Sequence, residues 1–196
     1  MNSKKENSLY SKWSLISDPP IAEALFGKVR WAWIWIIPRL YIGYKWLSAG
    51  WGKLNNPAWV GAKSGTALTG FINGALSKAT GAHPDVQGWY SVFLKNFVLP
   101  HAVPWSYAVS IGETLVGIGL ILGVFTGIAA FFGIFMNTSY LMAGTVSLNP
   151  EMLIISVFII LAWKTAGWWG LDRWLLPSLG TPWSTKRTHQ DQSKET

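Results

Sequence analysis

Cysteine is absent from the 196 residues of this chain. Its absence excludes disulfide bonds, thiolate nucleophiles, cysteine-ligated zinc and cysteine-held iron–sulfur clusters. Charged side chains are scarce as well, at 13% of the residues, which is about half the usual fraction of a soluble domain. The composition therefore disfavours a soluble enzyme and any redox centre built on the chain's own sulfur.

Hydrophobic residues make up 50% of the chain, and 14 of its residues are tryptophan. Tryptophan concentrates where an amphipathic ring lies between hydrocarbon and water, so the composition indicates a membrane protein in contact with the lipid bilayer. The net charge of +7 would favour nucleic acid in a soluble chain, but basic flanks of membrane spans produce the same excess. Because the basic residues gather mainly in the terminal regions, we expect no nucleic-acid partner.

Four apolar stretches are each long enough to cross a hydrocarbon core of roughly 30 Å. Glu113 is the only charged residue between positions 102 and 147, a length that fits two spans joined by a tight turn at 123–127. We therefore expect an all-α fold. It is predicted to be an integral membrane four-helix bundle with spans near 29–51, 104–124, 127–147 and 152–172.

Polar segments flank this predicted membrane domain, which covers 29–177. Residues 1–28 read as a retained tail in which Asp18 and a following proline start an interfacial helix over 19–27. A second polar tail covers 178–196. Since Lys and Arg gather in both tails, the positive-inside bias places both termini in the cytoplasm.

A long mixed loop, 53–101, separates the first two spans and is predicted to lie outside the cell. Its apolar run 89–98 is typical of a helix that lies on the membrane surface. The loop is long enough to fold back over the spans.

Each predicted span carries a polar residue near its middle: Arg39, Glu113, Asn137 and Lys164. An isolated ionised group at that depth costs roughly 2.5–3.5 kcal/mol on insertion scales, so these groups are expected to face one another. We predict that Arg39 pairs with Glu113. The alternative is that such a pair only fixes the helix register.

Helical spacing supports a shared interior. Small residues recur on the stripes that carry the polar groups, and they allow neighbouring helices to approach closely. These stripes comprise Arg39, Gly43, Trp46, Gly50 and Lys53; Ser106, Ser110, Glu113 and Gly117; and Gly133, Asn137, Tyr140 and Gly144. On another face, Gly119 and Gly123 fit either internal packing or a homodimer.

A surplus of positive charge in the predicted interior suggests a ligand. Arg39 and Lys164 bring two positive charges against one negative charge from Glu113, so a bound hydrogen-bond acceptor, such as a quinone carbonyl or a sulfur oxyanion, would balance them. His101 lies near the start of the second span and could reach a quinone head group, with a structural role as the alternative. All three histidines lie outside the spans, and no haem, flavin or metal motif occurs.

The chain resembles the DoxX/DoxD family of four-helix membrane proteins, whose members include the large subunit of thiosulfate:quinone oxidoreductase. The resemblance covers about 30–177, and the long loop is similar to the DoxD type. The motifs that carry it are Arg39-Leu40-Tyr41-Ile42-Gly43 with Gly50 and Lys53-Leu54; Gly112-Glu113 with Gly117, Gly119 and Gly123; Asn149-Pro150; and Ala166-Gly167 before Leu171-Asp172-Arg173.

The resemblance implies a multi-pass oxidoreductase subunit in a prokaryotic plasma membrane, passing electrons from thiosulfate or a related sulfur compound to quinone. Because the chain carries no redox centre, a small partner subunit or a sulfur-metabolising redox protein is also implied. In this interpretation the catalytic residues are Arg39, Glu113 and Lys164, and the contacts to an exchangeable quinone are Arg39, Trp46, Asn137 and His101. The alternatives are a non-catalytic anchor or assembly subunit for redox partners and a small permease.

Overall fold

A computed structural model describes residues 18–180 of the protein. The predicted tails at 1–28 and 178–196 therefore fall largely outside the described residues. Every regular element between 18 and 180 is helical, which confirms the all-α prediction. The elements are α2 Pro20–Ala22 with a π-helical turn Glu23–Gly27; a 3-10 segment Val29–Trp35 leading into α3 Ile36–Leu54; α4 Thr66–Ser77; α5 Gly88–Phe93, continued by η3 Leu94–Val98 and Leu99–His101 into α6 Ala102–Leu122; α7 Thr126–Met142; α8 Asn149–Leu161; and α9 Asp172–Ser178.

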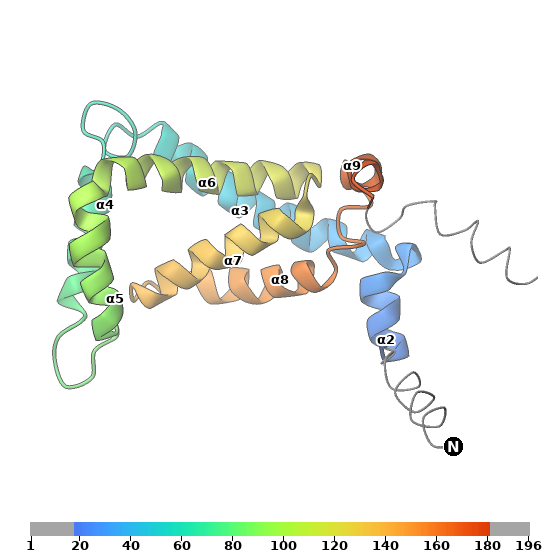
Figure 1. Cartoon of the computed structure of the whole chain (residues 1–196), viewed down its shortest axis with the longest axis horizontal. Helices are drawn as coiled ribbons and strands as arrows, with labels where there is room; N and C mark the ends of the chain where they lie inside the picture. The colour runs from blue at the N-terminus through green and yellow to red at the C-terminus, as the bar shows by residue number, and fades with distance from the viewer. Residues whose placement is uncertain (1–17, 181–196) are drawn as a thin grey trace, which may run out of the picture.

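Helices α3, α6, α7 and α8 run along the long axis of the molecule and pack on one another (Figure 1). Helices α4 and α5 lie across one end of this group, whereas α2 and α9 lie at the opposite end. We call α4 together with the segment 88–98 the cap. The cap thus covers the end at which α3 finishes and α6 begins.

Small residues explain the close contact between α3 and α6. A Cβ added at Gly117 of α6 would collide with the backbone of Leu47, and one added at Gly50 of α3 would lie 2.5 Å from the backbone nitrogen of Thr114. The two glycines sit on the stripes predicted to be buried, and both face the neighbouring helix. Glycine on both sides therefore lets the two backbones meet without intervening side chains.

The cap has a hydrophobic core of its own and is tied to α7. Ile72 of α4 and Leu94 of η3 are buried in this core. The Tyr90 hydroxyl donates a hydrogen bond of 2.9 Å to the carbonyl of Ser139, and Lys78 Nζ donates one of 2.7 Å to the carbonyl of Gly144. The segment predicted as a surface helix is therefore helical and folds back onto the packed helices.

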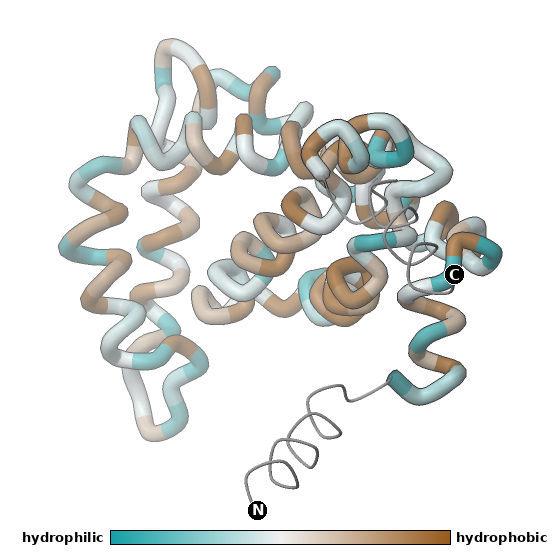
Figure 2. The backbone as a smooth tube through the Cα atoms, turned by 45° about the vertical axis from the view of Figure 1, so that its right-hand side comes forward, coloured by the Kyte–Doolittle hydropathy of each residue, from teal (hydrophilic) through white to brown (hydrophobic). Residues whose placement is uncertain are grey.

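The length and hydropathy of the described helices identify fewer membrane spans than the four expected from the sequence. Within 18–180, the one helix long and apolar enough to cross a membrane is the continuous run Gly88–Leu122, while α7 and α8 are apolar but shorter. The predicted fourth span, 152–172, is helical only as far as Leu161, and residues 162–171 form successive turns. Figure 2 shows hydrophobic and hydrophilic residues mixed in the loops and at the two ends of the molecule, with mostly hydrophobic or neutral residues along the packed helices.

Candidate functional site

Glu113 of α6 is the centre of a buried polar cluster at the cap end of the packed helices. Its side chain is 1% exposed, and both carboxylate oxygens accept a hydrogen bond. Lys53 Nζ at the end of α3 donates at 2.6 Å to one oxygen, and the hydroxyl of Tyr140 on α7 donates at 2.5 Å to the other. The cluster therefore joins three helices through one carboxylate.

Aromatic rings enclose this cluster. The ring of Tyr140 stacks near that of Trp46, with centroids 6.5 Å apart, and the ring of Phe71 from the cap meets it edge-on at 6.0 Å. Lys53 Nζ lies 5.1 Å from the centre of the Trp59 ring, and the Lys53 side chain keeps 20% of its surface exposed. The carboxylate is therefore buried, while the lysine that binds it is partly exposed to solvent.

The predicted pairing of Arg39 with Glu113 is wrong. Arg39 is buried at the other end of α3, where its guanidinium donates to the carbonyls of Ala166 at 3.0 Å and Trp169 at 3.1 Å. Fourteen residues of helix separate Arg39 from Lys53, which is about 21 Å. The side chains of Arg39 and Glu113 therefore lie towards opposite ends of the packed helices, and the four polar groups do not share one depth.

Arg39 belongs to a structural joint that we call the Asp172 joint. The carboxylate of Asp172 accepts hydrogen bonds from the backbone N–H groups of Phe125 at 2.6 Å and Thr126 at 2.9 Å, and so caps the start of α7. It also supplies the nearby opposite charge to Arg39. Gly123 adopts a left-handed conformation there, with φ of 65°, in the tight turn predicted between the second and third spans.

Lys164 and His101 also lie away from Glu113. Lys164 is exposed in the turns that follow α8, with its Nζ 5.9 Å from the centre of the Trp163 ring. His101 is exposed just before α6, and its Nδ1 is 2.9 Å from the carbonyl oxygen of Phe97. Twelve residues of chain separate His101 from Glu113, about 18 Å if helical throughout, so neither residue reaches the buried carboxylate.

Trp46 and Asn137 do lie beside the Glu113 cluster. Trp46 contacts Tyr140, and Asn137 precedes Tyr140 by about one helical turn on the buried face of α7. Neither the indole Nε1 of Trp46 nor either amide atom of Asn137 has a hydrogen-bond partner among the described residues, and Asn137 is fully buried. Buried polar atoms are normally paired, so these groups lack a partner, which the described residues do not supply, as do Arg39 Nε, Thr126 Oγ1 and Ser156 Oγ elsewhere in the structure.

Replacing Asn137 by leucine is expected to raise the thermal midpoint of the ligand-free protein. An unpaired buried amide costs about 1–3 kcal/mol, and leucine has a similar shape without that cost. Thermal unfolding of detergent-solubilised protein measures the change. Asn149→Leu is the matched control, because the Asn149 amide donates to the carbonyl of Thr145 at 3.0 Å and its loss should lower the midpoint. A lower midpoint for Asn137→Leu would mean that the amide already has a partner in the folded protein.

Sequence reasoning missed the two residues that hold Glu113. Lys53 was on the stripe of α3 that carries Arg39, and Tyr140 was on the stripe of α7 that carries Asn137, so the helical spacing already placed both on buried faces. The spacing did not show how far along the helix axis each residue lies relative to residues of the neighbouring helices, and this position decides which side chains meet. Within 18–180, no group of three or more His, Asp or Glu residues could hold a metal ion.

Large apolar side chains are exposed along the packed helices of this protein, whereas the charged side chains of Arg39 and Glu113 are buried, which is the arrangement of a membrane protein. Leu115 of α6, Phe135 of α7 and Ile154 of α8 are 62%, 61% and 59% exposed. The profile of the DoxX family matches residues 34–145, more than half of the chain, and the chain belongs to this family. It is thus a membrane protein of the DoxX type. Searches of curated proteins and of solved structures returned no match.

Proposed function

We propose that this DoxX-family protein is a multi-pass subunit of a membrane oxidoreductase, and that it binds quinone at the Glu113 cluster. The observation that carries the proposal is the pair of hydrogen bonds that Lys53 and Tyr140 make to the buried carboxylate. Two hydrogen-bond donors, one proton acceptor and flanking aromatic rings are the groups that recognise a quinone ring and protonate its oxygens.

The proposal places α3, α6, α7 and α8 across the bilayer. Their outward apolar side chains would contact lipid, and the charged side chains of Arg39 and Glu113 are buried in the interior. Helix α8 has 13 residues, about 20 Å of helix, and the turns at 162–171 would complete its crossing. Both termini then lie in the cytoplasm with the cap outside, as the basic tails favour.

The orphaned polar groups provide the test of fit for a quinone. Trp46 Nε1 is a donor, and the Asn137 amide is both a donor and an acceptor. The Trp46 ring stacks near that of Tyr140, and Asn137 lies about one helical turn before Tyr140. A quinone ring bound by Lys53 and Tyr140 would lie near these two polar groups. The residues present therefore fit a ligand with hydrogen-bonding oxygens.

Within this site the chain's own residues position donors and move protons. A quinone, when bound, accepts two electrons and two protons. Lys53 Nζ and the Tyr140 hydroxyl are the donors that would face its oxygens, while the Glu113 carboxylate orients both donors and can pass a proton from solvent at Lys53. The cap, by covering Glu113, keeps bulk water from the buried carboxylate.

The electrons are proposed to come from thiosulfate or a related sulfur compound, as the likeness to the DoxD type implies. Oxidation of two thiosulfate ions to tetrathionate releases two electrons, which matches the quinone reduction. With no cysteine in the chain, the sulfur compound would be oxidised on a partner subunit or directly beside the bound quinone. The exposed aromatic face of the cap, with Trp89 at 62% and Phe97 at 52%, is where such a partner would bind.

Glu113→Gln and Tyr140→Phe are expected to lower thiosulfate-dependent quinone reduction by about 100-fold or more, the usual size of a lost acid–base group. The protein is purified in native lipids, assayed with and without the products of neighbouring genes, and analysed for co-purified quinone. Tyr41→Phe and Glu151→Gln are matched controls, since these residues form an exposed hydrogen bond of 2.7 Å, and both should keep full activity.

A second candidate, a non-catalytic anchor subunit, is favoured by the same exposed aromatic face of the cap. The same experiment distinguishes this function from the catalytic one. If no quinone co-purifies and Glu113→Gln supports as much activity as the wild type in the assembled complex, the carboxylate serves helix packing and the anchor function stands.

A further inference from the structure

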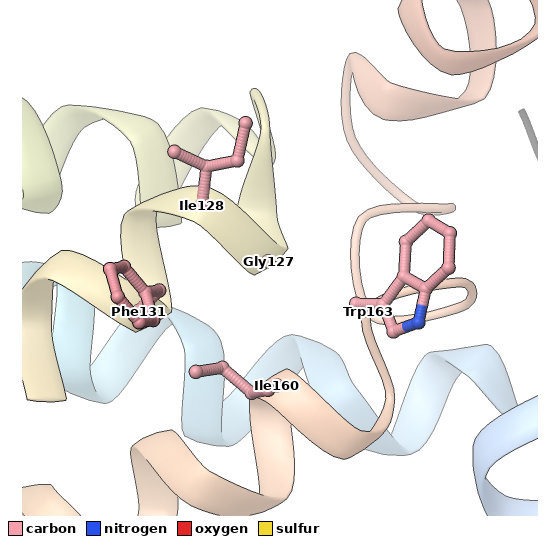
Figure 3. Close-up of a pocket in the computed structure, with 5 residues that line it drawn as sticks. All are labelled: Gly127, Ile128, Phe131, Ile160 and Trp163. Carbon is pink, nitrogen blue, oxygen red and sulfur yellow. The ribbon is translucent and has the colours of Figure 1, made fainter.

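An apolar groove lies on the outer side of α7 and α8, at the end of the molecule away from the cap. Its lining consists of Gly127, Ile128 and Phe131 of α7, Ile160 of α8 and Trp163, and its volume is about 290 Å³ (Figure 3). No polar surface lines it in the described structure. Ile128 and Phe131 are each 57% exposed, so the groove opens outward and not into the core.

The local sequence explains why the groove forms. The helical part of the fourth apolar stretch ends at Leu161, and Trp163 then packs against the first turn of α7. A Cβ at position 127 would lie only 2.9 Å from Trp163 Cβ, so glycine is needed for that contact. Trp163 therefore closes one end of the groove.

The ammonium group of Lys164 lies beside the end of the groove that Trp163 closes. Lys164 is exposed, and its Nζ lies over the Trp163 ring at 5.9 Å from the centroid. Within residues 18–180, its ammonium group makes no ion pair or hydrogen bond. Its charge is thus available to an outside group next to the apolar lining.

We propose that the groove binds an acyl chain of an anionic phospholipid whose head group pairs with Lys164. The lining is complementary to the chain, and the ammonium is complementary to the phosphate. The volume of 290 Å³ is several times the roughly 30 Å³ of a water molecule, which is close to the size of a methylene group, so a length of chain fits.

This inference rests on the membrane placement and not on the redox proposal. Gly127 and Tyr140 are separated by 13 residues of α7, about 20 Å, so the groove and the Glu113 cluster are distinct. In the proposed topology Lys164 lies on the cytoplasmic side, where anionic lipids attract basic residues. Lys164 is thereby assigned to lipid recognition in place of the catalytic role predicted from the sequence.

The head-group arm of the test compares Lys164→Gln with Lys45→Gln in nanodiscs of phosphatidylglycerol or phosphatidylcholine. Lys45 is a matched control because its Nζ also lies over an aromatic ring, that of Tyr41, at 5.4 Å. Native mass spectrometry counts the retained lipids. The wild type and Lys45→Gln should prefer phosphatidylglycerol, and Lys164→Gln should lose about fivefold of that preference, as expected for one basic residue. An unchanged preference in Lys164→Gln overturns the proposal.

The acyl-chain arm uses Ile128→Trp to fill the groove and Phe135→Trp, an exposed position on α7 outside the groove, as its control. Ile128→Trp should reduce retention of both lipids, whereas Phe135→Trp should retain them as the wild type does. Glycerol phosphate, which has the head group without the chain, should not compete. Competition by glycerol phosphate, or unchanged retention in Ile128→Trp, would refute the role of the groove. Quinone reduction should persist in every variant that loses lipid, which separates this result from the redox proposal.

Discussion

Asp172→Ala is expected to be among the most destabilising single substitutions, lowering the free energy of unfolding by about 3–5 kcal/mol, because two backbone N–H groups each lose a hydrogen bond to a charged acceptor, worth about 1.5–3 kcal/mol. The change removes both acceptors of the Phe125 and Thr126 backbone N–H groups. It also leaves the buried guanidinium of Arg39 without its nearby opposite charge. Unfolding by denaturant in detergent micelles measures the loss.

Two further variants isolate the cause of this effect. Asp172→Asn keeps one carbonyl acceptor and should lose less stability than Asp172→Ala. Asp85→Ala changes an exposed aspartate in the loop between α4 and α5 and should stay within about 0.5 kcal/mol of the wild type. Equal losses for Asp172→Ala and Asp85→Ala would show that the Asp172 joint does not hold the helices together.

Gly117→Ala is the second substitution with a large expected effect, about 3 kcal/mol or more of destabilisation. The added methyl group would collide with the backbone nitrogen and Cα of Leu47. Backbone atoms cannot rotate away as a side chain can, so α3 and α6 must separate. Thermal unfolding reports the stability, and a disrupted contact between the helices should also weaken the Lys53 to Glu113 bond.

Gly74→Ala is the matched control for this prediction. Gly74 lies inside helix α4, and nothing lies within 4 Å of the position of its missing Cβ. Alanine there should stabilise the protein by about 0.5–1 kcal/mol, since glycine is the weaker helix former. If both substitutions have the same sign, the contact at Leu47 is not what makes Gly117 necessary.

The helical faces were predictable from the sequence because they depend only on residue spacing. The stripes through Arg39 and Glu113 are buried, and glycines on them face the neighbouring helix. The tight turn at 123–127 was also predictable, since an apolar stretch of twice the span length needs a break. These features follow from local periodicity and from the dimensions of a bilayer.

The partners of the charged residues were not predictable in the same way. Spacing sets the direction in which a side chain points around its helix, but not the level at which it meets the next helix. Lys53 and Arg39 lie on one stripe of α3, but only Lys53 is at the height along the helix axis where Glu113 lies, so Glu113 pairs with Lys53. Hydropathy also could not show that α8 ends at Leu161. Because the helix ends there, Lys164 lies in an exposed turn, and the positive charge that we predicted for it in the interior is absent.

Arg39 finds its partners far along the chain, 127 residues away at Ala166 and 130 residues away at Trp169. During synthesis, at about 5–20 residues per second, the ribosome needs on the order of ten seconds to produce them after α3. Until residues 166–169 have been made, the Arg39 guanidinium lacks the carbonyl acceptors that it has in the folded protein. Insertion of α3 into the bilayer, as proposed above, would therefore require the insertion machinery to shelter this charge during that interval.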